Sequence, residues 1–432
     1  MKPNHASTVL GPQARRRGEW PQSRRPGAQE AGAAPGAVVG AWRSSDPHVA
    51  EYMERLRKEW IRAEGDEVAE QLDAAFGTFR PVGWSRPSNL GQVIDELTRT
   101  GRAARRLEYD VVDTAAAIDA IQSTHPAVMR LDHPAKQAVV DRAESSLAGC
   151  AAFAALYAGR SNDPVTAWSI DRYGRPDATT LDVAWSILTS AAPEATDGEM
   201  VGSDGVATFF RARLGGLSGW QVVVRPIQAA VHINPSARTI VVREDVAVTG
   251  AELERLVVHE IGAHIVRSEN ARRSTSTLAH LSLGRAAVAT EEGLAAWWED
   301  QYGASSPQVM HRYAARAIAV DVALSGGASD VMDTLTPFIG SGEAAVVTMR
   351  VKRGMADPEA PGAFTKDHSY LSGLLAVKAF LAADPPALPV LMATKWGLDM
   401  AGTAEELIGA GLLEPGRMPW EVADGGFDRP AH

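Results

Sequence analysis

Two histidines five residues apart constrain the fold of this 432-residue chain more than any other feature. Both lie in the stretch Leu256–His264, which reads LVVHEIGAH. Thr249 and Glu252 have the spacing of a capping box and predict a helix that begins there and runs through His259. On a regular α-helix, residues five apart point about 140° away from each other. A π-type turn returns such residues to one face, so the two histidines can act together only if the helix carries one. Gly262 between them makes that distortion easier.

The histidines and the glutamate between them have the chemistry of a zinc site. Zn²⁺ takes imidazole nitrogens and carboxylate oxygens in tetrahedral array, and a catalytic site leaves one position for water. Glu260 directly follows the first histidine, where a carboxylate can accept a proton from that water. Cys150 is the only cysteine, which excludes a cysteine-built metal site and an internal disulfide. His259 and His264 are therefore candidate zinc ligands, and Glu260 is a candidate catalytic base.

A third protein ligand has to come from another part of the chain. The stretch Thr290–Ala295, which reads TEEGLA, begins 26 residues beyond His264 and is expected to open a second helix. That interval suits a loop or short hairpin that returns a second helix to the metal. Glu291 and Glu292 are both candidates at this point of the argument.

Together, HEIGAH and TEEGLA resemble the family named for its QEGLA motif, described as flavohemoglobin expression-modulating proteins. This family is also called the tyrosine/phenylalanine carboxypeptidase domain family, and it is related to the microtubule-associated tyrosine carboxypeptidases of animals. The resemblance extends to three further stretches and covers roughly residues 90–382: YGRP at Tyr173–Pro176, RVKRG at Arg350–Gly354 and PGAFTKD at Pro361–Asp367.

The resemblance implies a complete zinc-peptidase site. Its members are His259, His264 and Glu292 as ligands of Zn²⁺ and Glu260 as the base. The chain departs from the family at Ala263, where Thr is usual, and at Glu291, where the motif has Gln. Neither position is a ligand in the family, so the implied metal site is unchanged.

The activity that the resemblance implies is the removal of a C-terminal, aromatic residue from a peptide or protein. Arginine binds a terminal carboxylate well through paired hydrogen bonds. We therefore expect Arg350 or Arg353 to bind the substrate carboxylate, and the further candidates for substrate binding are Lys366 and Tyr370. Three residues are candidates for stabilising the tetrahedral oxyanion, and the sequence does not choose among them: Tyr313, Tyr370 and His311.

Two alternatives remain open at this stage. One is a zinc endopeptidase with the same metal site. The other is a non-catalytic regulatory protein that contains zinc without turnover. A purely structural zinc site would have no need of Glu260 beside the first histidine.

The expected fold is α+β, a mostly helical zinc-peptidase (zincin-like) domain with a small antiparallel sheet before the metal-binding helix. Hydrophobic periodicity predicts helices at 49–76, 90–106, 114–121, 135–158 and 180–189, and strands at 220–225, 230–234 and 239–243. Residues 1–45, rich in Gly, Ala, Pro and Arg, are expected to form a disordered leader. Residues 46–160 are expected to form a helical region packed against a catalytic region at 161–432.

The composition restricts the partners. With 43 basic and 53 acidic side chains, the formal net charge is −10, which argues against nucleic-acid binding and against docking on an anionic membrane. No apolar run approaches the roughly 18 residues of a spanning helix. Arginines at 15–17 and 24–25 precede a run at 31–42, but that run is mostly Ala and Gly and lacks the apolar density of an export signal. We therefore expect a cytoplasmic protein that acts on peptide or protein C-termini.

Overall fold

The computed structural model describes residues 68–159, 161–190, 198–227, 229–274, 276–423 and 425–430. The predicted leader at 1–45 and most of the predicted helix at 49–76 lie outside them; the described part of that helix is helical and ends at residue 78. The described residues all belong to one compact unit, Arg55–His432. The division predicted at residue 160 stays a prediction.

Before the first strand, the regular elements of the described residues are all helices. They are α2 (Pro81–Trp84), α3 (Leu90–Thr100), α4 (Thr114–Ser123), α5 (His125–Arg130), α6 (Lys136–Tyr157), α7 (Asp163–Tyr173) and α8 (Ala178–Leu188). The predicted helices at 114–121, 135–158 and 180–189 match α4, α6 and α8 within two residues at each end. Asp113 and Asp177 cap α4 and α8 with their carboxylates. The helix predicted at 90–106 ends earlier, because Gly101 takes a left-handed conformation with φ of 71°.

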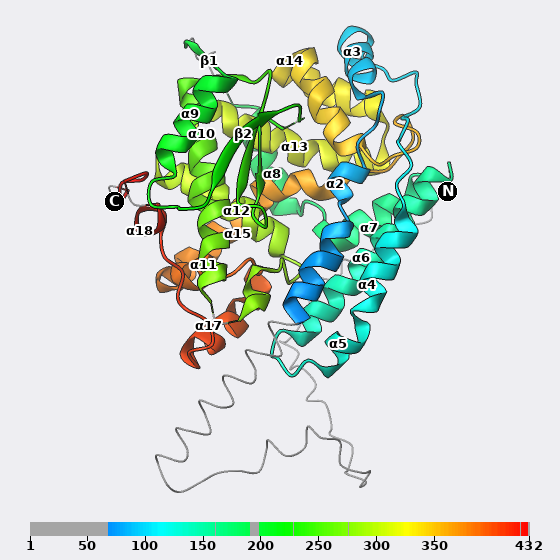
Figure 1. The fold of residues 1–432 in the computed structure, drawn as a ribbon. Coiled ribbons are helices and arrows are strands. Elements are labelled where there is room, and N and C mark those ends of the chain that lie inside the picture. The colour runs from blue at the N-terminus through cyan, green and yellow to red at the C-terminus, as the bar shows by residue number, and fades with distance from the viewer. Residues whose placement is uncertain are drawn as a thin grey trace, which may run out of the picture. The chain divides into compact units, whose positions relative to one another are not determined.

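Helices α4 to α7 pack together, as the cyan part of Figure 1 shows. Their core contains an edge-to-face cluster of aromatic rings whose centroids lie 5.1–6.2 Å apart: Phe79, Trp84, Phe153 and Trp168. Phe153 and Trp168 lie on opposite sides of residue 160 in the sequence, so this core is continuous across that point.

The strands follow α8. They and the helix among them are β1 (Met200–Gly202), α9 (Ser203–Arg213), β2 (Gln221–Arg225), β3 (Val231–Asn234), β4 (Thr239–Arg243) and β5 (Ala247–Thr249). The sheet predicted to be antiparallel is mixed. The order is β2-β4-β3, in which β3 and β4 form an antiparallel hairpin but β2 pairs with β4 in parallel. The physical reason lies in β4: its Ile240 and Val242 are fully buried, so this strand takes the centre and β2 joins its second edge.

The second half of the chain is again helical. It contains α10 (Gly250–Val257), the π-helix η2 (Val258–Ile265), α11 (Val266–Arg273), η3 (Thr277–His280), α12 (Ala287–Gln301), α13 (Pro307–Ser325), α14 (Ala328–Lys352), η4 (Thr365–His368), α15 (Ser369–Ala383), η5 (Pro385–Ala387), α16 (Leu388–Ala393), η6 (Leu398–Met400), α17 (Ala401–Gly409) and α18 (Pro419–Val422). The protein is thus mostly helical with small sheets, as expected for the α+β class. Within the described ranges, no helix has the length and apolarity required to span a membrane.

Two contacts place the helices that matter for the site. The π-helix is buried between the sheet and α12, where its Ile261 and Ile265 and Leu294 of α12 are inaccessible to solvent. Helix α12 also crosses α15 at Gly293 and Gly373. A Cβ atom at Gly293 would lie 2.3 Å from the backbone of Gly373, so this close crossing requires glycine.

Candidate metal centre

His259 and His264 face the same side of their helix because the helix is of the π type from Val258 to Ile265. Their ring centroids lie 4.9 Å apart. The five-residue spacing required this distortion, so the predicted π-type turn across Gly262 is confirmed. A π-helix has poorer hydrogen-bond geometry than an α-helix and occurs mostly at functional sites, which draws attention to the two imidazoles.

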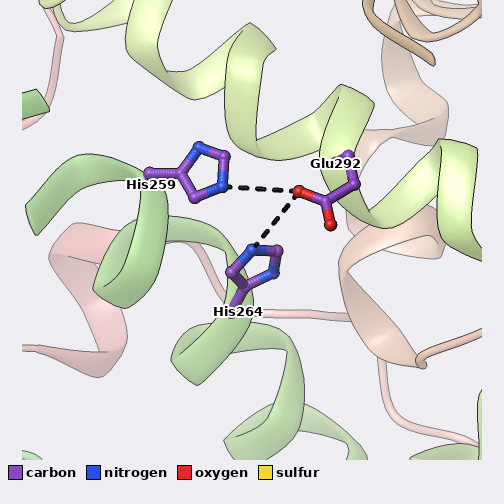
Figure 2. Close-up of side chains that lie close together, drawn as sticks. All are labelled: His259, His264 and Glu292. Carbon is purple, nitrogen blue, oxygen red and sulfur yellow. Dashed lines mark ion pairs between the residues drawn. The ribbon is translucent and has the colours of Figure 1, made fainter. Parts of the chain in front are cut away.

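The two imidazoles converge on Glu292 of α12, as Figure 2 shows. The Oε2 atom of Glu292 lies 3.5 Å from Nε2 of His259 and 4.0 Å from Nε2 of His264. Both distances are too long for hydrogen bonds, which are about 2.7–3.2 Å. Zinc–ligand bonds of about 2.1 Å in a tetrahedron place ligand atoms about 3.4 Å apart. The spacing of the three groups therefore fits a small cation between them.

Glu292 has one oxygen engaged and one oxygen free. Oε1 accepts a hydrogen bond of 2.6 Å from Nζ of Lys366. Oε2 is buried and has no hydrogen-bond partner among the described residues. A buried carboxylate oxygen without a donor is costly, so this atom fits the role of a metal ligand. Glu291, the other candidate in the sequence, does not approach the two Nε2 atoms in this way.

Each histidine is held by a glutamate on its other ring nitrogen. Nδ1 of His259 lies 2.8 Å from Oε1 of Glu299, and Nδ1 of His264 lies 2.7 Å from Oε1 of Glu291. A carboxylate can only accept, so both Nδ1 atoms carry a proton, which leaves Nε2 as the atom of each ring that can bind a metal once it is deprotonated. Such carboxylate–histidine pairs are typical of metal-binding imidazoles.

Glu299 was missed in the sequence and is the centre of a buried network. It is inaccessible to solvent and also accepts hydrogen bonds from Arg255 (2.7 Å) and from the Tyr313 hydroxyl (3.0 and 3.1 Å). The sequence did contain a signal for it. Glu299 follows Glu292 by seven residues, which is two helical turns along the same face of α12.

Glu291 lies in a second network of charges. It forms ion pairs with Arg267 and Lys395, and both of these cations are largely buried. Burial by itself raises the pKa of the Glu291 carboxyl, but Lys395, Arg267 and His264 outweigh it and hold that pKa well below its usual range. The carboxylate that orients His264 is thus ionised.

The electrostatics of Glu292 and His259 are those of a site for positive charge. Burial alone raises the pKa of Glu292, but Lys366 and the two histidines keep it well below its usual range. Burial lowers the pKa of His259, while Glu292, Glu299 and Glu260 together raise it well above its usual value. The carboxylates therefore create a negative potential at the point where the two Nε2 atoms meet.

A cavity of about 260 Å³ opens beside these groups. His259, Glu260, His264 and Glu292 line it, together with Tyr370, Lys395 and part of β3. Glu260, the predicted base, therefore lies on the same cavity as the candidate ligands. From β3, the residues that line the cavity are Val231, His232 and Ile233.

The predicted substrate-binding residues are only partly at this cavity. Tyr370 lines it, and its ring stacks on His259 at 6.2 Å between centroids. Lys366 is bound to Glu292, as described above. Arg350 and Arg353 instead form ion pairs with the fully buried Asp367.

The three candidates for stabilising an oxyanion are now distinguishable. Tyr313 donates its hydroxyl to Glu299, and Nε2 of His311 lies 3.2 Å from Oγ of Ser190. Of the three, Tyr370 alone lines the cavity.

Comparison with known proteins agrees with these motifs. A family model described as microtubule-associated tyrosine carboxypeptidase matches residues 102–425, well over half of the chain. A mouse (Mus musculus) protein, microtubule-associated tyrosine carboxypeptidase 1, is 28% identical over 204 residues, which are 46% of this chain and 42% of the mouse protein. The chain therefore matches less than half of the length of that relative.

Proposed function

The chain belongs to the microtubule-associated tyrosine carboxypeptidase family, and on that premise we propose that it is a zinc-dependent carboxypeptidase. The proposed substrate is a peptide or protein with a free C-terminus, from which an aromatic residue is released. The tyrosine in the name of the mouse relative supports the aromatic residue.

The observation that carries the proposal is the unpartnered oxygen of Glu292. Lys366, the strongest donor nearby, binds Oε1 and leaves Oε2 between two imidazole nitrogens at 3.5 and 4.0 Å. A cluster built only for structural ion pairing would bring these groups to hydrogen-bond distance. His259, His264 and Glu292 would hold Zn²⁺ through Nε2, Nε2 and Oε2. When bound, the metal would supply a Lewis acid that polarises the peptide carbonyl and acidifies water.

The chain supplies the proton transfers of hydrolysis. Glu260 lines the cavity beside His259, so its carboxylate accepts a proton from the attacking water as the new C–O bond forms. The same carboxyl then gives the proton to the leaving amine as the C–N bond breaks. Tyr370 is the favoured donor to the oxyanion, because Tyr313 and His311 are engaged elsewhere.

The test is a Glu260→Gln variant of the zinc-loaded protein. We expect it to retain one zinc ion per chain, because no ligand is removed, and to lose at least about 100-fold in the release of C-terminal tyrosine from a peptide. The matched control is Glu254→Gln, because Glu254 lies six residues before Glu260 and pairs with Arg213 away from the cavity. It should keep both zinc and activity.

Other outcomes of this experiment would select the alternatives. Turnover of Glu260→Gln within a few-fold of the parent protein would remove Glu260 from the mechanism. A parent protein that holds zinc but releases nothing would favour a regulatory role. Cleavage of an internally quenched peptide blocked at its C-terminus would select an endopeptidase.

A further inference from the structure

Arg316 on α13 is a cation without a partner. No acceptor within the described part of the chain takes a hydrogen bond or ion pair from its guanidinium, and its Nε atom is buried. The side chain is half-buried, so part of its surface remains open to solvent. A desolvated guanidinium is costly unless an anion or several carbonyl oxygens compensate it. Stabilisation of the fold therefore does not explain why a guanidinium is placed here.

The surroundings of Arg316 have too few acidic groups. Arg350 and Arg353 lie nearby and share one carboxylate, that of Asp367, which binds Arg350 through both oxygens and Arg353 through one. Three guanidinium groups thus face a single carboxylate, and Arg316 is the one that this carboxylate does not bind. Burial and then repulsion from Arg350 lower the pKa of Arg316, which is the signature of a charge in an unfavourable environment. The cluster lacks an anion.

Arg316 lies one aromatic ring away from the candidate metal centre. Its Cζ atom is 4.8 Å from the centroid of the Tyr370 ring, and that ring stacks on His259. A carboxypeptidase has to hold the terminal carboxylate one residue from the scissile carbonyl, a span of roughly 3.5 Å in an extended chain. The two ring distances put Cζ of Arg316 at most about 11 Å from the centroid of the His259 ring, which leaves room for a bound carboxylate, one residue of the peptide and a metal ion between them.

Stacking on tyrosine does not by itself account for Arg316. The rings of Tyr370 and Tyr313 cover part of the guanidinium, at 4.8 and 5.9 Å from their centroids. A ring face cannot accept the N–H groups that lie in the guanidinium plane. A guanidinium presents these donors as a planar fork, which a carboxylate matches in shape and charge.

We propose that Arg316 binds the C-terminal carboxylate of the substrate and so selects peptides with a free C-terminus. This inference rests on the proposed peptidase function and names the residue that restricts the enzyme to substrates with a free C-terminus. It assigns the role to Arg316 rather than to Arg350 or Arg353, because Asp367 already occupies those two side chains.

The experiment measures binding and turnover separately. Two N-acetylated peptides ending in tyrosine are compared, one with a free carboxylate and one with a C-terminal amide. Binding is measured by calorimetry with the zinc-loaded Glu260→Gln protein, with and without Arg316→Gln, and kcat/KM is measured in the parent background. Arg316→Gln should weaken binding of the acid about 10- to 100-fold and leave binding of the amide unchanged.

Two controls separate binding from folding. Arg213→Gln removes an arginine that pairs with Glu254, and it should leave the acid-to-amide ratio unchanged. Arg316→Gln should not lower the urea midpoint of unfolding, because it removes a charge without a partner. Arg316→Lys should keep part of the preference for the acid.

The inference fails if the parent protein does not prefer the acid, or if Arg316→Gln keeps the preference of the parent protein. If the parent protein binds the acid through Arg316 but releases no residue, the carboxylate site stands and the proposed peptidase function is wrong. If it releases tyrosine and Arg316→Gln releases it equally well from the acid, the peptidase stands and the assignment of Arg316 is wrong.

Discussion

Replacement of Glu299 by Gln tests whether the network behind His259 positions a metal ligand. Glu299 does not line the cavity and forms no hydrogen bond with Glu292; it acts through Nδ1 of His259 at 2.8 Å. The amide of Gln has nearly the same volume but no charge, and one of its two ends is a donor. The change therefore weakens the acceptor that fixes the ring and the protonated nitrogen of His259, and it creates no cavity.

The structure gives the size of two separate effects. Arg255 loses its 2.7 Å bond to Glu299 but keeps Glu252, at 2.8 and 2.9 Å, so no cation is left without a partner. The loss of one charge-assisted hydrogen bond should lower the free energy of unfolding of the zinc-free protein by about 2 kcal/mol. Loss of the carboxylate behind a metal-binding histidine should in addition weaken zinc binding by about 10- to 100-fold.

Zinc affinity is measured by competition with a chromophoric chelator, and stability by urea unfolding of the zinc-free protein. Glu252→Gln is the matched control, because Glu252 holds the same Arg255 but does not touch His259. It should lower stability and leave the zinc affinity within threefold of the parent protein. Equal zinc affinities for Glu299→Gln and the parent protein, together with a lower urea midpoint, would refute the positioning role and leave Glu299 as a packing residue.

Three further changes have defined outcomes. Gly293→Ala adds a methyl group 2.3 Å from the backbone of Gly373, so α12 has to move; we expect a loss of about 1–3 kcal/mol in the free energy of unfolding and a weaker zinc site at Glu292, measured by urea unfolding and chelator competition. Lys352→Met removes the buried ammonium that donates to four main-chain carbonyls at 2.6–3.2 Å, and should cost about 3–5 kcal/mol in the same unfolding assay. Burial lowers the pKa of His133 from 6.5 to about 4, so the folded state resists its protonation; the free energy of unfolding should fall by about 3 kcal/mol as pH falls from 6.5 to 4, and this part of the pH dependence should be absent in His133→Gln.

The elements that the sequence predicted well are those with local signals. Helix α10 begins at Thr249 because that hydroxyl accepts from the amide of Glu252, which is the capping pair visible in the sequence. The π-helix followed from chemistry rather than from propensity, since two histidines five apart can share a metal only in that geometry. The role expected for Gly262 is weaker than its position suggested. A Cβ atom there would meet Phe427 at 3.7 Å, an ordinary contact, so the π-helix does not need glycine for space.

The features that were missed depend on contacts between distant segments. Strands β1 and β5 have three residues each, too few for an alternating pattern. The parallel pairing of β2 with β4 joins strands that are not consecutive, because the chain forms β3 at the far edge before it returns to β4 in the centre. Arg316 could not be singled out from the sequence. Arg316 stands out because too few acidic groups surround it. That shortage becomes visible only when α13, α14 and η4 pack around Asp367.

The three candidate ligands are held in the same way, and this shared arrangement is the strongest argument that they form a single site. Each has two polar atoms, of which one is anchored: Nδ1 of His259 on Glu299, Nδ1 of His264 on Glu291, and Oε1 of Glu292 on Lys366. Each glutamate behind a histidine is in turn held by a buried arginine. Of the remaining atoms, Oε2 of Glu292 has no hydrogen-bond partner among the described residues, and the two Nε2 atoms lie close to it in one cluster (Figure 2). If the cluster existed only to stabilise the fold, its oppositely charged groups would be in direct contact. The anchors instead keep the three free atoms at the separation that a cation requires.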